Sequence, residues 1–158
     1  MNNIGIVLAC AGAAICASLA GCGSAIGVMA AGKAATGVTS ENPDLFGKVL
    51  VLQALPGTQG IYGFLIAILI MVRIGILGGA PVNLTAAQGW SFFFAAMPMA
   101  ICGLISGICQ GNAAVGAIHM TGRQPDASGK GITMTALVET YAILALLASI
   151  LLMFGINI

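Results

Sequence analysis

Four long apolar stretches, separated by short polar connections, make up most of the chain. They cover residues 4–35, 47–77, 86–119 and 129–156. Each stretch exceeds the roughly 20 residues that an α-helix needs to cross the hydrocarbon core of a bilayer. The pattern predicts an all-α membrane protein with four transmembrane helices. Because a helix rises about 1.5 Å per residue, we expect the helices to project beyond the lipid.

The composition of the chain is typical of a membrane protein. Of its 158 residues, 59% are hydrophobic and 6% are charged, and the mean hydropathy is +1.09. Soluble domains carry about 25% charged residues, so we expect an integral, multi-pass protein of the cell membrane. The first stretch is too long for the apolar part of a secretory signal and has no positively charged segment before it. We therefore expect it to remain in the mature protein.

The two halves of the chain repeat each other. A shift of 82 positions, the separation between Gly21 and Gly103, aligns them along most of their length. The aligned pairs include Ser24 with Ser106, Pro43 with Pro125, Asp44 with Asp126, Lys48 with Lys130, and Leu55 with Leu137. The sequence therefore predicts two tandem, duplicated helical hairpins, residues 1–78 and 79–158. Both enter the membrane in the same direction, unlike the inverted repeats of many transporters.

The few charged residues predict the orientation of the chain. Lys33 and Lys48 flank the first connection, Arg123 and Lys130 flank the third, and residues 78–85 of the second connection carry no charge. Lys and Arg concentrate in cytoplasmic loops. We therefore expect the first and third connections in the cytoplasm and both termini outside. Arg73, near the outer end of the second stretch, is the exception, and we expect its side chain to snorkel towards water.

Glu139 is the only carboxylate inside a long apolar run, and no Lys or Arg lies near it in the sequence. A charged Asp at the centre of a membrane helix costs roughly 2.5–3.5 kcal/mol on insertion scales, so an acid within the membrane is a candidate ion or proton site. In the repeat alignment, Gly57 occupies the equivalent position. The second hairpin therefore carries an intramembrane acid that the first hairpin lacks.

Small residues recur at helical spacing in the first and third stretches. They are Gly23 and Gly27, and Gly103, Gly107 and Gly111. Such spacing lets membrane helices approach closely, and an ordinary helix-dimer seam would explain it. A ring of identical subunits, with the first and third helices as its inner wall, explains it as well. We favour the ring because one monomer offers no obvious way to close both small-residue faces.

Several polar residues are expected at the depth of Glu139. Gln110 lies about as far before the third connection as Glu139 lies after it, and the repeat places Thr58 and Gln59 at the same depth. Tyr62 shares their helix face, because it follows them by four and three positions. The sequence therefore predicts that four polar side chains converge on one carboxylate.

Pro56 and Gly57 interrupt the second helix beside this cluster. Proline lacks an N–H and clashes with the carbonyl four residues earlier, so a loosened carbonyl, that of Leu52 by this argument alone, could coordinate a cation. Hard cations favour several oxygen ligands. A carboxylate, two amide oxygens, a hydroxyl and a carbonyl would suit sodium, whereas a proton would need only the acid. A kink healed by neighbouring groups is the simpler explanation of the break.

A family resemblance is carried by three segments: Leu55-Pro-Gly-Thr-Gln-Gly60-Ile-Tyr62-Gly63, Gln110-Gly111, and Val138-Glu139-Thr140-Tyr141-Ala142. Over its whole length the chain resembles the sodium-translocating rotor-ring proteolipids of bacterial V-type ATPases. The resemblance implies a non-catalytic subunit that forms a ring with identical copies among membrane lipids and turns against a stator subunit that supplies an arginine. A central-stalk subunit is expected at the cytoplasmic loops, and no nucleic-acid partner is expected. The implied Na⁺ site consists of the Leu55 carbonyl, Thr58, Gln59, Gln110 and Glu139, with Tyr62 hydrogen-bonded to the glutamate.

Three other functions fit parts of the pattern. A proton-translocating rotor ring would use the acid, although the glutamines and the threonine argue against it. A small proton-coupled exporter should have an aromatic-lined cavity, yet only Tyr62 and Tyr141 are near the acid. A purely structural protein with four spans would not use the acid at all. A nucleotide-binding loop at residues 27–33 is excluded, because Ala34 stands where a magnesium-binding Ser or Thr is required.

Overall fold

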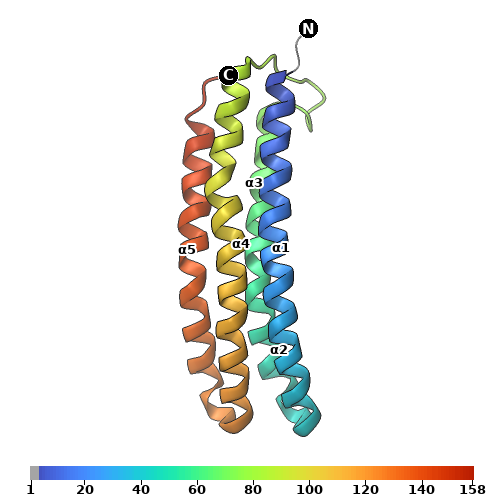
Figure 1. Cartoon of the computed structure of the whole chain (residues 1–158), viewed down its shortest axis with the longest axis vertical. Coiled ribbons are helices and arrows are strands. Elements are labelled where there is room, and N and C mark those ends of the chain that lie inside the picture. Colours follow the sequence, from blue (N-terminus) through green and yellow to red (C-terminus); the bar gives the residue numbers. More distant parts are fainter. Residues whose placement is uncertain (1–3) are drawn as a thin grey trace.

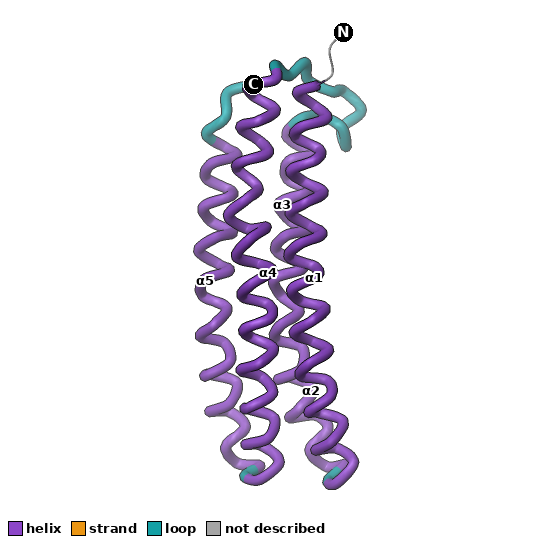
Figure 2. The backbone as a smooth tube through the Cα atoms, viewed as in Figure 1, coloured by secondary structure: helices purple, strands orange, loops and turns teal. Residues whose placement is uncertain are grey.

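The computed structural model, which describes residues 4–158, is a helical bundle in which consecutive spans run antiparallel and α1 and α4 run parallel (Figure 1). Its helices are α1 (Ile4–Glu41), α2 (Phe46–Ala54), α3 (Thr58–Arg73), α4 (Ala86–Arg123) and α5 (Ser128–Phe154). Because α2 and α3 lie on one span, the four apolar spans are Ile4–Glu41, Pro43–Arg73, Ala86–Arg123 and Pro125–Phe154. The part of the chain that is described contains no strand (Figure 2). The predicted four long helices are confirmed.

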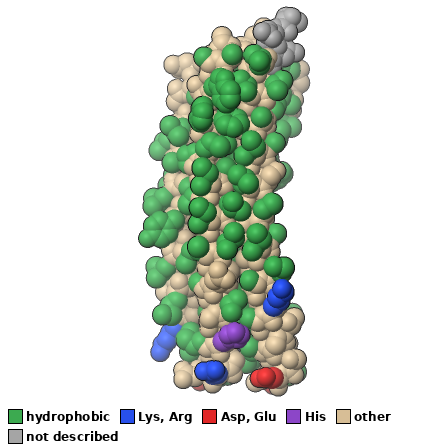
Figure 3. Space-filling view, viewed as in Figure 1, with side chains coloured by type: hydrophobic (Ala, Val, Ile, Leu, Met, Phe, Trp, Pro, Cys, Tyr) green, Lys and Arg blue, Asp and Glu red, His purple; other side chains and the backbone are tan. Residues whose placement is uncertain are grey.

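Proline marks the two tight connections at one end of the bundle. Pro43 and Pro125 each begin a short 3₁₀ turn just after a long helix ends, a position at which the missing N–H costs nothing. At the opposite end, the connection between α3 and α4 is longer and turns at Gly75, whose φ of +77° favours glycine. Hydrophobic side chains are spread over the length of the face in Figure 3, and the charged side chains visible there gather towards the tight end.

Facing glycines bring α1 and α4 into close contact. A Cβ atom added at Gly23 would lie 2.5 Å from the carbonyl oxygen of Leu104, and one added at Gly107 would lie 2.7 Å from the carbonyl carbon of Gly23. Both distances are far below the 3.5–4.0 Å of a favourable carbon contact. The expectation that one monomer could not close its small-residue faces is therefore wrong. Residue spacing identified the small-residue faces of α1 and α4, but it did not show that these two faces pack against each other.

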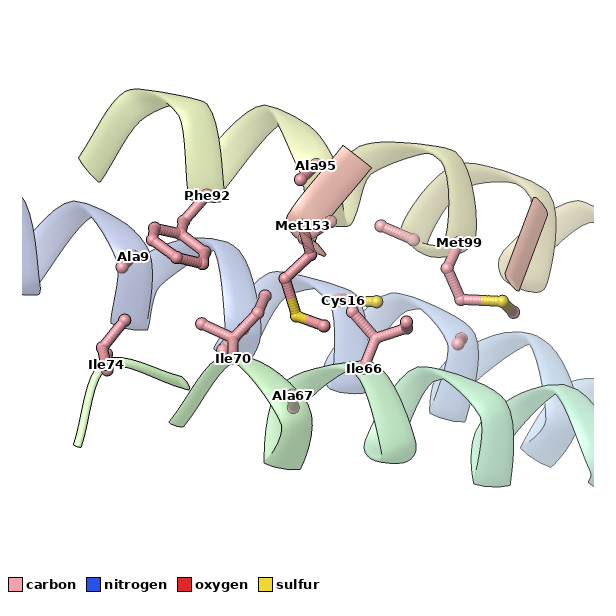
Figure 4. Packing of buried hydrophobic residues seen from close by; sticks show 14 of the residues in the cluster. Ala9, Cys16, Ile66, Ala67, Ile70, Ile74, Phe92, Ala95, Met99 and Met153 are labelled. Atoms are coloured by element: carbon pink, nitrogen blue, oxygen red, sulfur yellow. The ribbon is translucent and has the colours of Figure 1, made fainter. Parts of the chain in front are cut away.

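Apolar clusters lie on both sides of a buried polar layer. The larger cluster, towards the connection between α3 and α4, includes Ile66, Ile70, Phe92, Met99 and Met153 (Figure 4). The smaller cluster, towards the tight connections, comprises Ala31, Ala35, Val49, Leu52, Ala114, Ala117 and Ile118. Three buried polar side chains occupy the intervening stretches of α3 and α4: Gln59, Ser106 and Gln110. Because hydrocarbon surrounds this layer, its polar atoms must find partners within it.

Two cationic side chains tie the hairpins together near their ends. Nζ of Lys48 donates a hydrogen bond to the carbonyl of Pro125 (2.9 Å). Nη2 of Arg73 donates to the carbonyl of Ile156 (2.7 Å), and the guanidinium carbon lies 5.2 Å from the centroid of the Phe154 ring. The half-buried Arg73 side chain satisfies a carbonyl just beyond the end of α5, where carbonyls lack helical partners. This contact is compatible with snorkelling, which stays a prediction.

Candidate ion-binding site

The second span is broken at the edge of the polar layer. After α2, residues Leu55–Gly57 form a single 3₁₀ turn, and α3 begins at Thr58. Pro56 has no N–H with which to continue the α-helical hydrogen bonds. The Leu55 carbonyl instead accepts hydrogen bonds from the backbone N–H of Thr58 and from its hydroxyl (3.1 Å for the hydroxyl). The predicted interruption is confirmed, and it places this carbonyl beside a polar side chain.

Immediately after the break, α3 packs closely against α1. The N–H of Gly60 donates to Oγ of Ser24 (2.8 Å). A Cβ atom added at Gly63 would clash with the side chain of Ala20 and would lie 2.9 Å from the carbonyl oxygen of Cys16. This close contact fixes the rotation of α3 about its axis. The Gln59 side chain consequently points into the bundle.

Two glutamines form the buried half of the site. The side chains of Gln59 on α3 and Gln110 on α4 are both fully buried. The Gln59 amino group donates to Oε1 of Gln110 and to Oγ of Ser106 (3.1 Å for the serine). The Gln110 amino group donates to the carbonyl of Thr135 (3.3 Å), and Oγ1 of Thr58 lies 3.4 Å from Oε1 of Gln59. Both amides are thereby engaged, as buried polar groups require.

Glu139 on α5 lies at the more exposed edge of the same cluster. The Tyr62 hydroxyl donates to Oε1 of the half-buried carboxylate (2.6 Å), and Nε2 of Gln110 lies 3.5 Å from Oε2. No Lys, Arg or His side chain within residues 4–158 forms an ion pair with Glu139. Hydrogen bonds from α3 and α4 therefore hold the carboxylate, and no cationic side chain neutralises it.

The structure brings the six residues nominated from the sequence into one hydrogen-bonded chain: Leu55, Thr58, Gln59, Gln110, Glu139 and Tyr62. One detail differs from the expected arrangement. Gln110 turns its amino group, rather than its oxygen, towards Glu139, and its oxygen accepts the hydrogen bond from Gln59. Tyr141 does not join the cluster, since it is 66% exposed.

Sequence reasoning missed two residues that hold the amides. Ser106 accepts a hydrogen bond from Gln59, and the Thr135 carbonyl accepts one from Gln110. The four-residue spacing between Ser106 and Gln110 could have placed both on one face of α4. The role of Thr135 had no such indication, because the contact is made by its backbone and not by its side chain.

Comparisons with known proteins agree on a single family. Residues 4–70 and 93–152 match the family model that describes the C subunit of ATP synthase. The chain is 43% identical over 151 residues to V-type sodium ATPase subunit K of Enterococcus hirae, an alignment that covers 96% of this chain and 93% of that protein. It is 45% identical over 145 residues to A-type ATP synthase subunit K of Methanocaldococcus jannaschii, with 92% of this chain and 62% of that protein covered.

Proposed function

The chain belongs to the family of the ATP synthase C subunit, and on this premise we propose that Glu139 binds sodium ions and carries them through the membrane sector of a rotary ATPase. Membership makes the chain a non-catalytic, ion-translocating rotor-ring subunit of a V- or A-type ATPase. The choice of sodium is supported by the Enterococcus hirae relative, which is named as part of a sodium ATPase. It is also supported by the oxygen atoms around Glu139.

The unpaired carboxylate of Glu139, in hydrogen-bond contact with a buried polar cluster, is the observation that carries this proposal. One ionised carboxylate balances the charge of one monovalent cation, and neutral oxygens complete the shell that a hard cation favours. The proposed ligands are the Leu55 carbonyl, the Thr58 hydroxyl, the amide oxygens of Gln59 and Gln110, and the Glu139 carboxylate. Tyr62 is proposed to hold the carboxylate in position through its 2.6 Å hydrogen bond.

Two features of the structure favour this ligand set. The Leu55 carbonyl is preferred to that of Leu52 because the Thr58 hydroxyl joins Leu55 to the cluster. Gln110 keeps its oxygen on the side of Gln59, where it accepts a hydrogen bond. Both amide oxygens therefore lie within the polar layer before any ion is considered. Because the Gln110 amino group faces Glu139, this amide would have to turn before its oxygen could bind the same ion as the carboxylate.

The charge of Glu139 suggests how transport is coupled to rotation. Bound sodium neutralises the carboxylate while the site faces lipid, where an isolated charge is costly. Beside the arginine of a stator subunit, the ionised carboxylate is favoured by the opposite charge, and the sodium ion is released. Each site then alternates between neutral and charged states as the ring turns. The tight connections are proposed to lie in the cytoplasm and to bind the central stalk, with both termini outside.

Modification of Glu139 by a hydrophobic carbodiimide tests the sodium assignment. Membranes containing the complete ATPase are treated at neutral pH with increasing NaCl, with choline chloride keeping the ionic strength constant. Sodium is expected to slow the modification in a concentration-dependent way, because an occupied carboxylate is unavailable to the reagent. The Glu139→Gln variant controls for reaction elsewhere. A modification rate that does not depend on sodium would instead favour a proton-carrying ring.

A further inference from the structure

Ser106 stands out among the buried polar residues because the ligand set does not include it. Its side chain is only 5% exposed, and its hydroxyl oxygen accepts a hydrogen bond from Nε2 of Gln59 across the boundary between the hairpins. Its counterpart in the first hairpin, Ser24, accepts instead from the backbone N–H of Gly60. Equivalent serines therefore have different partners, and only Ser106 contacts a proposed ligand side chain.

We propose that Ser106 is a specificity-determining positioning residue, which orients the Gln59 amide so that the site prefers sodium to a proton. This inference rests on the proposed function. The Gln59 amino group has two hydrogens to donate, and Ser106 and Gln110 each provide an acceptor. With both donors directed at α4, the amide oxygen faces the Thr58 hydroxyl, 3.4 Å away. Ser106 thus determines which end of the amide is presented to an ion.

The alternative orientation of the amide would oppose cation binding. Rotation by half a turn would place the amino group beside Thr58 and would bring the Gln59 oxygen towards the Gln110 oxygen, which is also an acceptor. Donor hydrogens carry partial positive charge, so they would repel a cation at the proposed site. Ser106 disfavours this rotation, because its oxygen is one of the two acceptors that keep the amino group in place.

The orientation of the Gln59 amide by Ser106 should matter for sodium binding and not for proton binding. A proton binds to the carboxylate alone, and Ser106 makes no hydrogen bond to Glu139; the carboxylate is instead contacted by Tyr62 and Gln110. Sodium requires several oxygens at once, including the one that Ser106 orients. Loss of the Ser106 hydroxyl should therefore weaken sodium binding while proton binding at Glu139 stays unchanged.

Carbodiimide modification of Glu139 in membranes containing the complete ATPase tests this role. We expect Ser106→Ala to raise the sodium concentration that gives half protection about tenfold, the effect of losing one buried hydrogen bond. In sodium-free buffer, its modification rate across pH should match that of the unaltered chain. Ser106→Thr keeps the hydroxyl and should stay close to the unaltered chain. Ser106→Cys has a side chain of similar size but a weaker acceptor, so it should also raise the sodium concentration that gives half protection. It replaces Ser106→Ala in the test if the alanine variant does not assemble.

Ser149→Ala is the matched control, because Ser149 is a buried serine that accepts a hydrogen bond from the backbone N–H of Met99, outside the proposed site (3.1 Å). It should leave sodium protection unchanged. Unaltered protection in Ser106→Ala and Ser106→Cys, or an equal shift in Ser149→Ala, would overturn the inference while leaving the sodium site in place. Absence of sodium protection in the unaltered chain would overturn the proposed function itself, and the positioning role with it.

Discussion

At the scale of single residues, each oxygen of the Glu139 carboxylate has a donor from a different hairpin. Tyr62 lies 2.6 Å from one oxygen and belongs to the first hairpin, whereas Gln110 lies 3.5 Å from the other and belongs to the second. The acid therefore depends on residues that no single hairpin provides. Of these two contacts, the shorter one should contribute more to holding the carboxylate.

Tyr62→Phe removes the shorter contact and keeps the aromatic ring. A hydrogen bond to a charged group contributes about 1.5–3 kcal/mol, and 1.4 kcal/mol corresponds to a factor of about ten. We therefore expect at least a roughly tenfold weaker protection of Glu139 by sodium in the carbodiimide assay. Tyr141→Phe is the control, because that tyrosine is 66% exposed and its hydroxyl makes no hydrogen bond within residues 4–158. Equal effects of the two changes would contradict the role of Tyr62.

Thr135 has a fully buried hydroxyl without a hydrogen-bond partner among the described residues. Valine has nearly the same shape and lacks this oxygen. An unsatisfied buried polar group costs about 1–3 kcal/mol, so Thr135→Val should raise stability by about 1 kcal/mol, measured from the thermal unfolding of the detergent-solubilised ring. Thr121→Val, which removes a hydroxyl bonded to the Ala117 carbonyl (2.9 Å), should bring no such gain. Destabilisation of both variants alike would count against this account.

At the scale of elements, glycines set the positions of α1, α3 and α4. Gly23 and Gly107 let the backbones of α1 and α4 meet, while Gly60 and Gly63, just after the turn at Leu55–Gly57, let α3 pack against α1 so that Gln59 points into the bundle. The glycines between α1 and α4 and the turn at Leu55–Gly57 lie far apart in the sequence, but both influence how the helices pack. The distance between α3 and α4 across the two glutamines depends on both.

Gly107→Ala tests the close contact of α1 and α4. The added Cβ atom would lie 2.7 Å from the carbonyl carbon of Gly23, and because this neighbour is backbone, the helices must separate. Such overpacking typically costs about 1–3 kcal/mol. Gly116→Ala, on the same helix but with no atom within 4 Å of the new Cβ, should instead be neutral or stabilising. The two variants are compared by thermal unfolding of the purified ring. A similar loss of stability in both would contradict the importance of the close contact between α1 and α4.

At the scale of the whole molecule, hydrophobic length was enough to predict the four spans, and the missing N–H of Pro56 was enough to predict the interruption of the second one. The residues around Glu139 could also be nominated, because equal distances from a tight connection imply equal depth. The sequence did not reveal that the small faces of α1 and α4 close on each other, since spacing identifies a face but not its partner. The role proposed for Ser106 was also missed, although its four-residue spacing from Gln110 places both residues on one face of α4.

The orientation of the chain in the membrane remains a prediction and can be measured. In a cysteine-free background, Asn83→Cys in the long connection and Asp126→Cys in a tight connection both place an exposed thiol at an end of the bundle. We expect a membrane-impermeant maleimide added to intact cells to label the cysteine at position 83 only, because the tight connections carry most of the Lys and Arg residues. Labelling of the cysteine at position 126 alone would mean that the chain is inverted.

The bonds at the carboxyl-terminal end also affect how the protein can be engineered. Arg73 holds the carbonyl of Ile156, and the Gln88 side chain donates to that of Asn157 (2.8 Å). An affinity tag or fluorescent reporter fused after Ile158 would begin next to these anchored residues and could pull them from their partners. The exposed connection between α3 and α4, around Gly79, is the better insertion point for such a fusion.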